Sequence, residues 1–136
     1  MRRDFDLPEE DEQFLSNNGF QWETVIENNV NWLIIRDFPI ADGYNYSKAD
    51  AAVQIPSQYP EHKLDMVNFY PHLLRADQIA APNVSPGPNI EGRQYQQWSR
   101  HRDWRMGIDA LENHVEEIHY WLENEFNKRP KQNVAA

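Results

Sequence analysis

Phe20-Gln21-Trp22-Glu23-Thr24-Val25-Ile26 and, after a short turn, Val30-Asn31-Trp32-Leu33-Ile34-Ile35-Arg36-Asp37-Phe38 decide the fold of this 136-residue chain. In the first half, large or β-branched side chains alternate with mostly polar ones, which is typical of a strand with one buried face. The second half is more apolar and predicts a more buried strand. Glu27-Asn28-Asn29 has the composition of a turn. The stretch therefore predicts two successive strands.

Further strand patterns follow this stretch, and a helix pattern precedes it. Residues 50–55 and 64–70 predict a third and a fourth strand, ended by Pro56 and Pro71. Short strands at this spacing favour an antiparallel meander. On the other side, Pro8, the acidic residues after it and the stop at Gly19 predict a helix over residues 8–17.

The C-terminal half divides into an irregular part and a helical part. No period persists from residue 72 to 97, where prolines and glycines recur, so we expect a long loop of the kind that is often functional. Apolar residues from Ile108 to Phe126 recur at helical spacing. Asp109 with Glu112 fits a capping box, and Pro130 ends the helix. We predict a single α+β domain over residues 1–136, with its core at about 7–127.

Composition narrows the possible functions. The formal net charge of -9 argues against nucleic acid as the main partner. No apolar run approaches the roughly 20 residues of a membrane span, and no signal peptide is recognisable, so we expect a cytoplasmic protein without a membrane partner. The chain has no cysteine, which excludes disulfides and a thiol nucleophile.

A basic and aromatic stretch, residues 93–107, stands out against this acidic background. It holds two of the five tryptophans and four of the thirteen basic residues. Tryptophan and arginine are typical of binding surfaces, so an acidic protein surface or a carboxylate is the expected ligand. The candidate partner-binding residues are Trp98, Arg100, Arg102, Trp104 and Arg105.

The same stretch contains candidates for nucleophilic catalysis. Ser99 and His101 are two residues apart, so in a strand their side chains share a face. Asp103 or Asp109 is the candidate to orient the imidazole. The five histidines show no metal-binding spacing, and no phosphate-binding loop is present, so we expect neither a metal nor a cofactor.

Ala81-Pro82-Asn83-Val84 is similar to the His-Pro-Asn-Val motif of the ubiquitin-conjugating (E2) fold, with alanine in place of histidine. A further set of motifs resembles more closely the family termed prokaryotic E2 family E, over about residues 7–126. This set consists of Leu7-Pro8, Trp32-Leu33-Ile34-Ile35, Gly43-Tyr44-Asn45, Ile55-Pro56 to Tyr59-Pro60, Leu64-Asp65-Met66, Gly92-Arg93, Trp98-Ser99-Arg100-His101 and Trp104-Arg105 to Gly107.

The resemblance implies an N-terminal helix, a four-stranded antiparallel meander, a long active-site loop and a C-terminal helix. It also implies an E1-like adenylating enzyme, a ubiquitin-like protein and a JAB-type peptidase as pathway partners. An E2 carries its cargo as a thioester on a cysteine, whose expected position here is Tyr95 or Gln96. Asn83, a possible oxyanion donor, is retained.

The missing cysteine leaves four interpretations open. The chain is a binding scaffold for the E1-like enzyme, the ubiquitin-like protein or both. Alternatively, Ser99 or Ser85 carries the cargo as an oxyester with His101 as base. A third interpretation is that a cysteine has been replaced in this sequence, at Ala80, Ala81 or Ser99. The fourth is a stand-alone hydrolase that uses Ser99 and His101.

Overall fold

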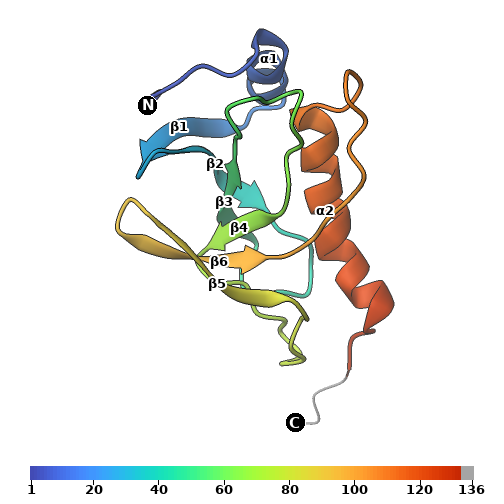
Figure 1. Ribbon diagram of the computed structural model, residues 1–136. Coiled ribbons are helices and arrows are strands. Elements are labelled where there is room, and N and C mark those ends of the chain that lie inside the picture. The colour runs from blue at the N-terminus through green and yellow to red at the C-terminus, as the bar shows by residue number, and fades with distance from the viewer. Residues whose placement is uncertain (133–136) are drawn as a thin grey trace.

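A computed structural model describes residues 1–132 and confirms the α+β class (Figure 1). The predicted first helix and first four strands are all present, and the end of the predicted domain, residues 133–136, lies outside the described residues. Neither helix of the described part has the length and apolar character needed to cross a membrane. The elements are α1 (Glu9–Asn17), β1 (Gln21–Glu27), β2 (Val30–Pro39), β3 (Lys48–Gln54), β4 (Val67–Tyr70), β5 (Val84–Ile90), β6 (Arg93–Trp98) and α2 (Leu111–Lys128).

The sheet has six strands, so the prediction of a four-stranded meander is incomplete. Strands β1 to β4 do form a meander, but the order is β1-β2-β3-β4-β6-β5, and all neighbours are antiparallel. The prediction of an irregular segment over residues 72–97 is wrong, because β5 and most of β6 lie within it. Glu91 and Gly92, with φ of 54° and 77°, make the tight turn between these two strands.

Prolines in β5 explain why the sequence pattern missed this hairpin. Pro86 and Pro88 lie in an edge strand, where a missing backbone N–H is tolerated. The pairing with β6 shifts register between Pro86 and Asn89. At this irregularity a side chain on Gly87 would come within 2.8 Å of the Tyr95 carbonyl oxygen, so glycine is required there.

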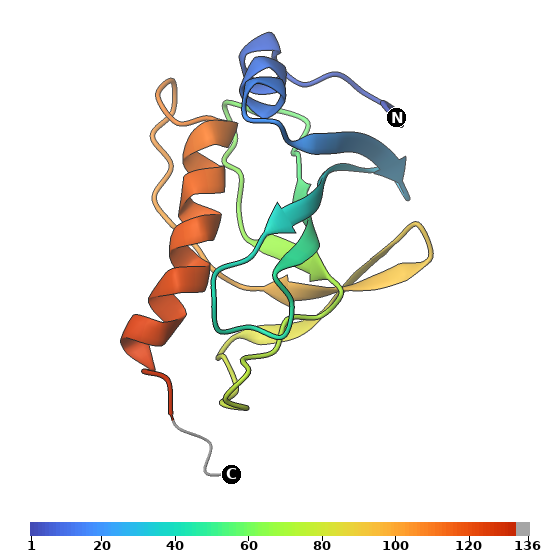
Figure 2. The same ribbon diagram turned by 180° about the vertical axis from the view of Figure 1, so that it is seen from behind.

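Helix α2 covers one face of the sheet and creates the main core (Figure 2). Its buried residues Leu111, Val115, Ile118 and Leu122 belong to the same apolar cluster as Trp98. The predicted C-terminal helix is confirmed, but it begins three residues after Ile108.

The predicted capping box at Asp109 is wrong. The Asn113 side-chain oxygen accepts a hydrogen bond from the Ala110 N–H at 3.0 Å, whereas Asp109 accepts from the main chain of Arg105.

The opposite face of the sheet carries a smaller core that the β5–β6 hairpin helps to cover. Ile90 and Tyr95 of the hairpin belong to one apolar cluster with Val25, Trp32, Ile34 and Ala52 of β1, β2 and β3. Arg36 ties the hairpin turn to the other edge, since its guanidinium contacts Glu23 at 2.9 Å and Glu91 at 2.7 Å. The sheet therefore curls, and apolar side chains are buried on both of its faces.

His114 of α2 is fully buried in the main core, where its Nε2 lies 2.9 Å from the Met66 carbonyl oxygen. A backbone carbonyl only accepts hydrogen bonds, so Nε2 carries the proton. Burial lowers the pKa of His114 to about 4. The imidazole is therefore neutral in the folded protein at neutral pH.

This depressed pKa predicts a loss of stability in mild acid. Between the ordinary pKa of 6.5 and the folded-state pKa of about 4, the unfolded chain binds a proton that the folded protein excludes. We expect His114 to contribute a fall of about 3 kcal/mol in the free energy of unfolding as the pH drops through this window. Urea denaturation at pH 7 and at pH 4 measures the effect.

His114→Gln is the control, because glutamine keeps an N–H donor for the Met66 carbonyl but has no titrating proton. We expect its unfolding free energy to depend less on pH over the same window, by about the same 3 kcal/mol. Equal pH dependence in the two proteins would show that His114 does not carry a depressed pKa.

Candidate functional site

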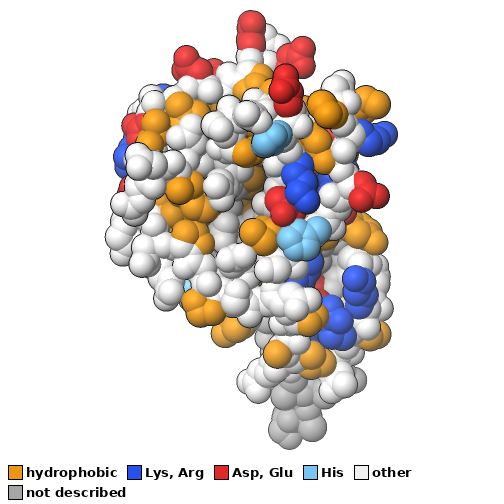
Figure 3. All heavy atoms as spheres, in the orientation of Figure 1, with side chains coloured by type: hydrophobic (Ala, Val, Ile, Leu, Met, Phe, Trp, Pro, Cys, Tyr) orange, Lys and Arg blue, Asp and Glu red, His pale blue; other side chains and the backbone are white. Residues whose placement is uncertain are grey.

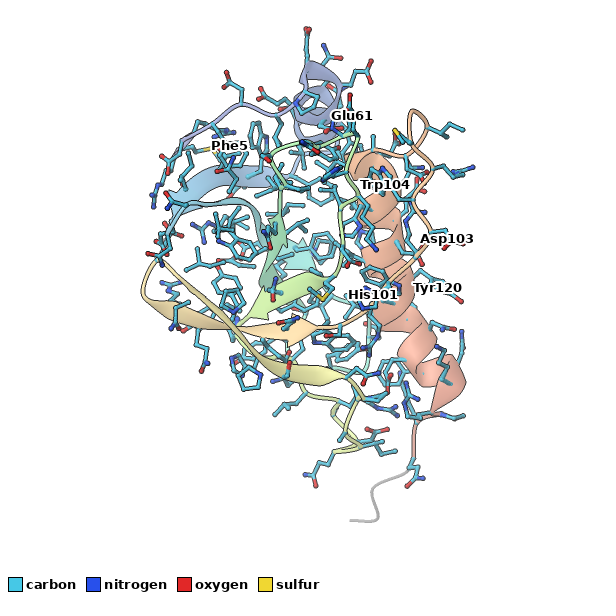
Figure 4. All side chains as sticks on the ribbon, viewed as in Figure 1. Phe5, Glu61, His101, Asp103, Trp104 and Tyr120 are labelled. Carbon is cyan, nitrogen blue, oxygen red and sulfur yellow. The ribbon has the colours of Figure 1, made fainter. Side chains whose placement is uncertain are left out.

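The candidate site is the segment 99–110, which connects the end of β6 to the start of α2 (Figure 4). Two side-chain contacts join it to the loop between β3 and β4. The Trp104 Nε1–H donates to the Pro60 carbonyl oxygen at 3.2 Å, and the His101 Nδ1 lies 2.8 Å from the Asp65 Oδ1. The segment is therefore held against the neighbouring loop.

His101 is engaged with Asp65, so the predicted Ser99–His101 dyad is not formed by the hydrogen bonds of the described residues. The imidazole meets Asp65, which the sequence analysis did not consider. Neither aspartate expected to orient the imidazole does so: Asp103 is exposed and points outward (Figure 4), and Asp109 is buried in contacts with arginines.

Ser99 instead lies beside Asn83, because the pairing of β5 with β6 brings these two residues together. Val84 pairs with Trp98 across the hairpin, and the Ser99 N–H donates to the Asn83 carbonyl oxygen at 3.0 Å. Asn83 is exposed and Ser99 is half-buried. Ser85, the other candidate hydroxyl, lies opposite Gln97 on the same hairpin. The sheet thus brings the main chains of Ser99 and Asn83 together, but among the described residues no hydrogen bond joins the Ser99 hydroxyl to the Asn83 amide or to a base.

Tyr95 and Gln96, the expected positions of a cysteine, are not in a loop. Both lie in β6 and are buried, Tyr95 completely. The Gln96 side chain bonds the main chain of Leu73 through both its oxygen, at 2.9 Å, and its nitrogen, at 3.0 Å. Both residues therefore have structural roles. The expectation that Tyr95 or Gln96 occupies the position of the E2 cysteine in an active-site loop is wrong for this fold.

The two tryptophans of the segment also have structural contacts. Trp98 is 1% exposed and packs edge-on against Phe69 and Tyr44, so its side chain belongs to the core and not to the surface. Trp104 is half-buried and packs near Tyr59, with ring centroids 6.3 Å apart. Only part of the Trp104 surface is open to a partner.

The three arginines proposed for partner binding differ in their surroundings. Arg102 and Arg105 both contact Asp109, at 3.1 Å and 2.9 Å. The hydrogen bonds from Arg105 lower the pKa of Asp109 to about 2, so this carboxylate stays charged. Arg100 points the other way, toward the second half of α2, where it lies 4.0 Å from Glu125.

A turn that the sequence analysis passed over is the most exposed apolar feature of the segment. Arg105 to Asp109 form a turn closed by main-chain hydrogen bonds from Ile108 and Asp109 to the Arg105 carbonyl, with Gly107 at φ 79°. Met106 is 70% exposed and Ile108 is 66% exposed. Two large apolar residues around a glycine, directly before a helix, were the available signal, but Ile108 was assigned to the helix.

This turn borders a groove of about 400 Å³ that joins three parts of the chain. Pro8 and Glu10 come from the start of α1, Pro60 and Glu61 from the loop between β3 and β4, and Met106 and Ile108 from the turn. The buried Asp11 accepts a hydrogen bond from the Tyr59 hydroxyl at 2.5 Å beneath it. This hydrogen bond ties the loop between β3 and β4 to α1 at the groove.

Comparison with known protein families identifies one match. The model of prokaryotic E2 family E matches residues 7–125, which is most of the chain. Comparison with curated proteins and with solved structures gives no match. The helix, antiparallel sheet and helix described above are consistent with the E2 fold. The chain thus belongs to prokaryotic E2 family E, as a member without a cysteine.

Proposed function

We propose that this protein acts by binding, as an E2-like scaffold in a prokaryotic ubiquitin-like conjugation pathway. Its partner at the turn Arg105–Asp109 is the E1-like adenylating enzyme. The ubiquitin-like protein and a JAB-type peptidase are further partners that the family suggests. The proposal starts from a chemical constraint: a chain without cysteine cannot hold a cargo as a thioester.

The observation that carries the proposal is the exposure of Met106 and Ile108 on one turn. Large apolar side chains cost free energy in water, and neighbouring ones commonly mark interaction sites. Arg105, whose side chain is 61% exposed, adds a charged group to the same turn. Figure 3 shows hydrophobic side chains gathered at the upper right, over the start of α2.

The support beneath the turn favours binding by a preformed surface. Asp109 is 3% exposed and accepts hydrogen bonds from both the main chain and the side chain of Arg105. Because these contacts restrain the backbone of the turn, its main chain loses little conformational entropy when a partner covers Met106 and Ile108. The adjacent groove gives a partner a concave surface beside the two apolar side chains.

Truncation of the two exposed side chains tests the binding role. In the double variant Met106→Ser and Ile108→Ser, we expect affinity for the E1-like enzyme of the same pathway to fall by about tenfold or more, because apolar anchors at an interface each contribute about 1–2 kcal/mol. Surface plasmon resonance or calorimetry with purified enzyme measures the change.

Leu74→Ser is the matched control, since Leu74 is also large, apolar and 63% exposed but lies outside the turn and its groove. It should bind as the unsubstituted protein does, and all three substitutions should leave the melting temperature nearly unchanged. Equal binding by the double variant and the control would refute the role of the turn.

A second prediction separates binding from transfer through a serine hydroxyl. We expect no covalent adduct when the protein is incubated with the E1-like enzyme, ATP, magnesium and the ubiquitin-like protein, because within residues 1–132 no imidazole hydrogen-bonds Ser99 and His101 contacts Asp65 instead. Denaturing electrophoresis with and without reducing agent reads out the adduct.

The opposite outcome would be recognisable. An oxyester would resist the reducing agent, break with hydroxylamine, and disappear in Ser99→Ala or Ser85→Ala. Such an adduct would replace the scaffold role with that of an E2-like transferase. Binding measured with Ser99→Ala provides the control, because loss of the hydroxyl leaves the turn Arg105–Asp109 unchanged.

A further inference from the structure

A second surface lies toward the C-terminal end of α2, where the helix meets the start of the segment 99–110. It is a polar groove of about 240 Å³, bordered by the side chains of Arg100, Tyr120, Asn124, Lys128 and Arg129. Figure 3 shows Lys and Arg side chains gathered over this lower part of the molecule. None of these five residues lines the groove beside Met106 and Ile108.

The floor of the groove is a buried carboxylate surrounded by guanidinium groups. Glu125 is 2% exposed and accepts hydrogen bonds from Arg75 at 3.1 Å and from the Arg129 Nε at 2.8 Å. Arg75 in turn contacts Asp77 at 2.5 Å. Hydrogen bonds to Asp77 raise the pKa of Arg75, and hydrogen bonds to Glu125 raise that of Arg129. Both of these arginines are thus compensated by carboxylates.

Arg100 is the exception. Its Nη1 donates to the Ser99 carbonyl oxygen at 3.1 Å, and its Nη2 stays 4.0 Å from Glu125, too far for a hydrogen bond. Its side chain is only 16% exposed, because the guanidinium lies over the Trp98 ring. Burial lowers the pKa of Arg100, and the negative charge of Glu125 offsets this only in part. Within residues 1–132, no carboxylate hydrogen-bonds this partly buried cation.

The charge around the groove is positive in a chain whose net charge is -9. Three positive charges border the groove, on Arg100, Lys128 and Arg129, and two negative charges, on Glu117 and Glu125. With His101 counted as neutral, the net charge of the groove is +1. A monovalent anion balances this excess. The planar fork of an arginine matches the two oxygens of a carboxylate, and the Tyr120 hydroxyl and Asn124 amide are further donors.

We propose that this groove binds a carboxylate, which Arg100 holds and Lys128 helps to neutralise. The ligand is either a small free carboxylic acid or the C-terminal carboxylate of a polypeptide. Either one would give Arg100 a hydrogen-bonded carboxylate, which Glu125 at 4.0 Å does not provide. This site is independent of the turn Arg105–Asp109 and does not depend on any component of the conjugation pathway.

A titration followed by nuclear magnetic resonance tests the proposal. The probes are N-acetylalanine, which carries a carboxylate, and N-acetylalanine amide, which has nearly the same shape without the charge. At constant ionic strength, we expect saturable shifts of the backbone amides near Arg100 and from Tyr120 to Arg129 with the acid, and none with the amide. Equal affinities for acetate and N-acetylalanine would identify a small free acid as the ligand. A lower affinity for acetate would identify the C-terminal carboxylate of a polypeptide.

Variants locate the binding. Arg100→Gln should lower the affinity for N-acetylalanine by about tenfold, because a charge-assisted hydrogen bond is lost. Lys128 is exposed, so its substitution should not disturb folding. Lys128→Gln should lower the affinity for N-acetylalanine by about threefold. Arg93→Gln is the matched control: Arg93 also lies over an aromatic ring, that of Tyr70, but does not line the groove.

Three results would overturn the proposal. The first is equal shifts with the acid and its amide. The second is unchanged affinity in Lys128→Gln together with either unchanged affinity or loss of folding in Arg100→Gln. The third is tighter binding of inorganic phosphate than of N-acetylalanine, which would assign the groove to a different class of anion.

Discussion

Burial of the Trp98 side chain between the sheet and α2 is the contact on which the rest of the structure depends. The indole is the last side chain of β6, packs against Phe69 and Tyr44, and donates from Nε1 to the Gln96 side chain at 2.9 Å. Gln96 in turn holds the main chain of Leu73. Since Trp98 is anchored beside the middle of the helix, the next twelve residues must run back along α2 before it can begin.

This path separates two surfaces with different chemistry. Near its end, the turn Arg105–Asp109 presents apolar side chains above a groove with Glu10 and Glu61 on its walls. Near its beginning, the Arg100 guanidinium lies over the Trp98 ring and borders the second groove, which is rich in cationic side chains. Two separate surfaces on one small domain suit a protein that contacts more than one partner. The same path carries Ser99 away from any hydrogen-bonded imidazole in the described chain.

Intramolecular pairing accounts for most of the charge that looked functional in the sequence. Arg102 and Arg105 are bound to Asp109, and Arg36 bridges the two ends of the curled sheet. The sheet edges are protected as well: residues 2–4 hydrogen-bond along β1, and β5 carries Pro86 and Pro88. A chain with a net charge of -9 thus uses its few arginines mainly to hold carboxylates in place.

The sequence by itself determined the helices and the first four strands, because periods of 3.6 and 2 residues record which local face is buried. Family motifs indicated the E2-like fold, and composition excluded thiol chemistry. The sequence pattern missed β5 and β6, because Pro86, Gly87 and Pro88 interrupt the alternation in an edge strand. Only the tertiary structure decided the partners of Ser99, His101 and Arg100, since Asn83, Asp65 and Glu125 approach them through strand pairing and helix packing that local spacing does not record.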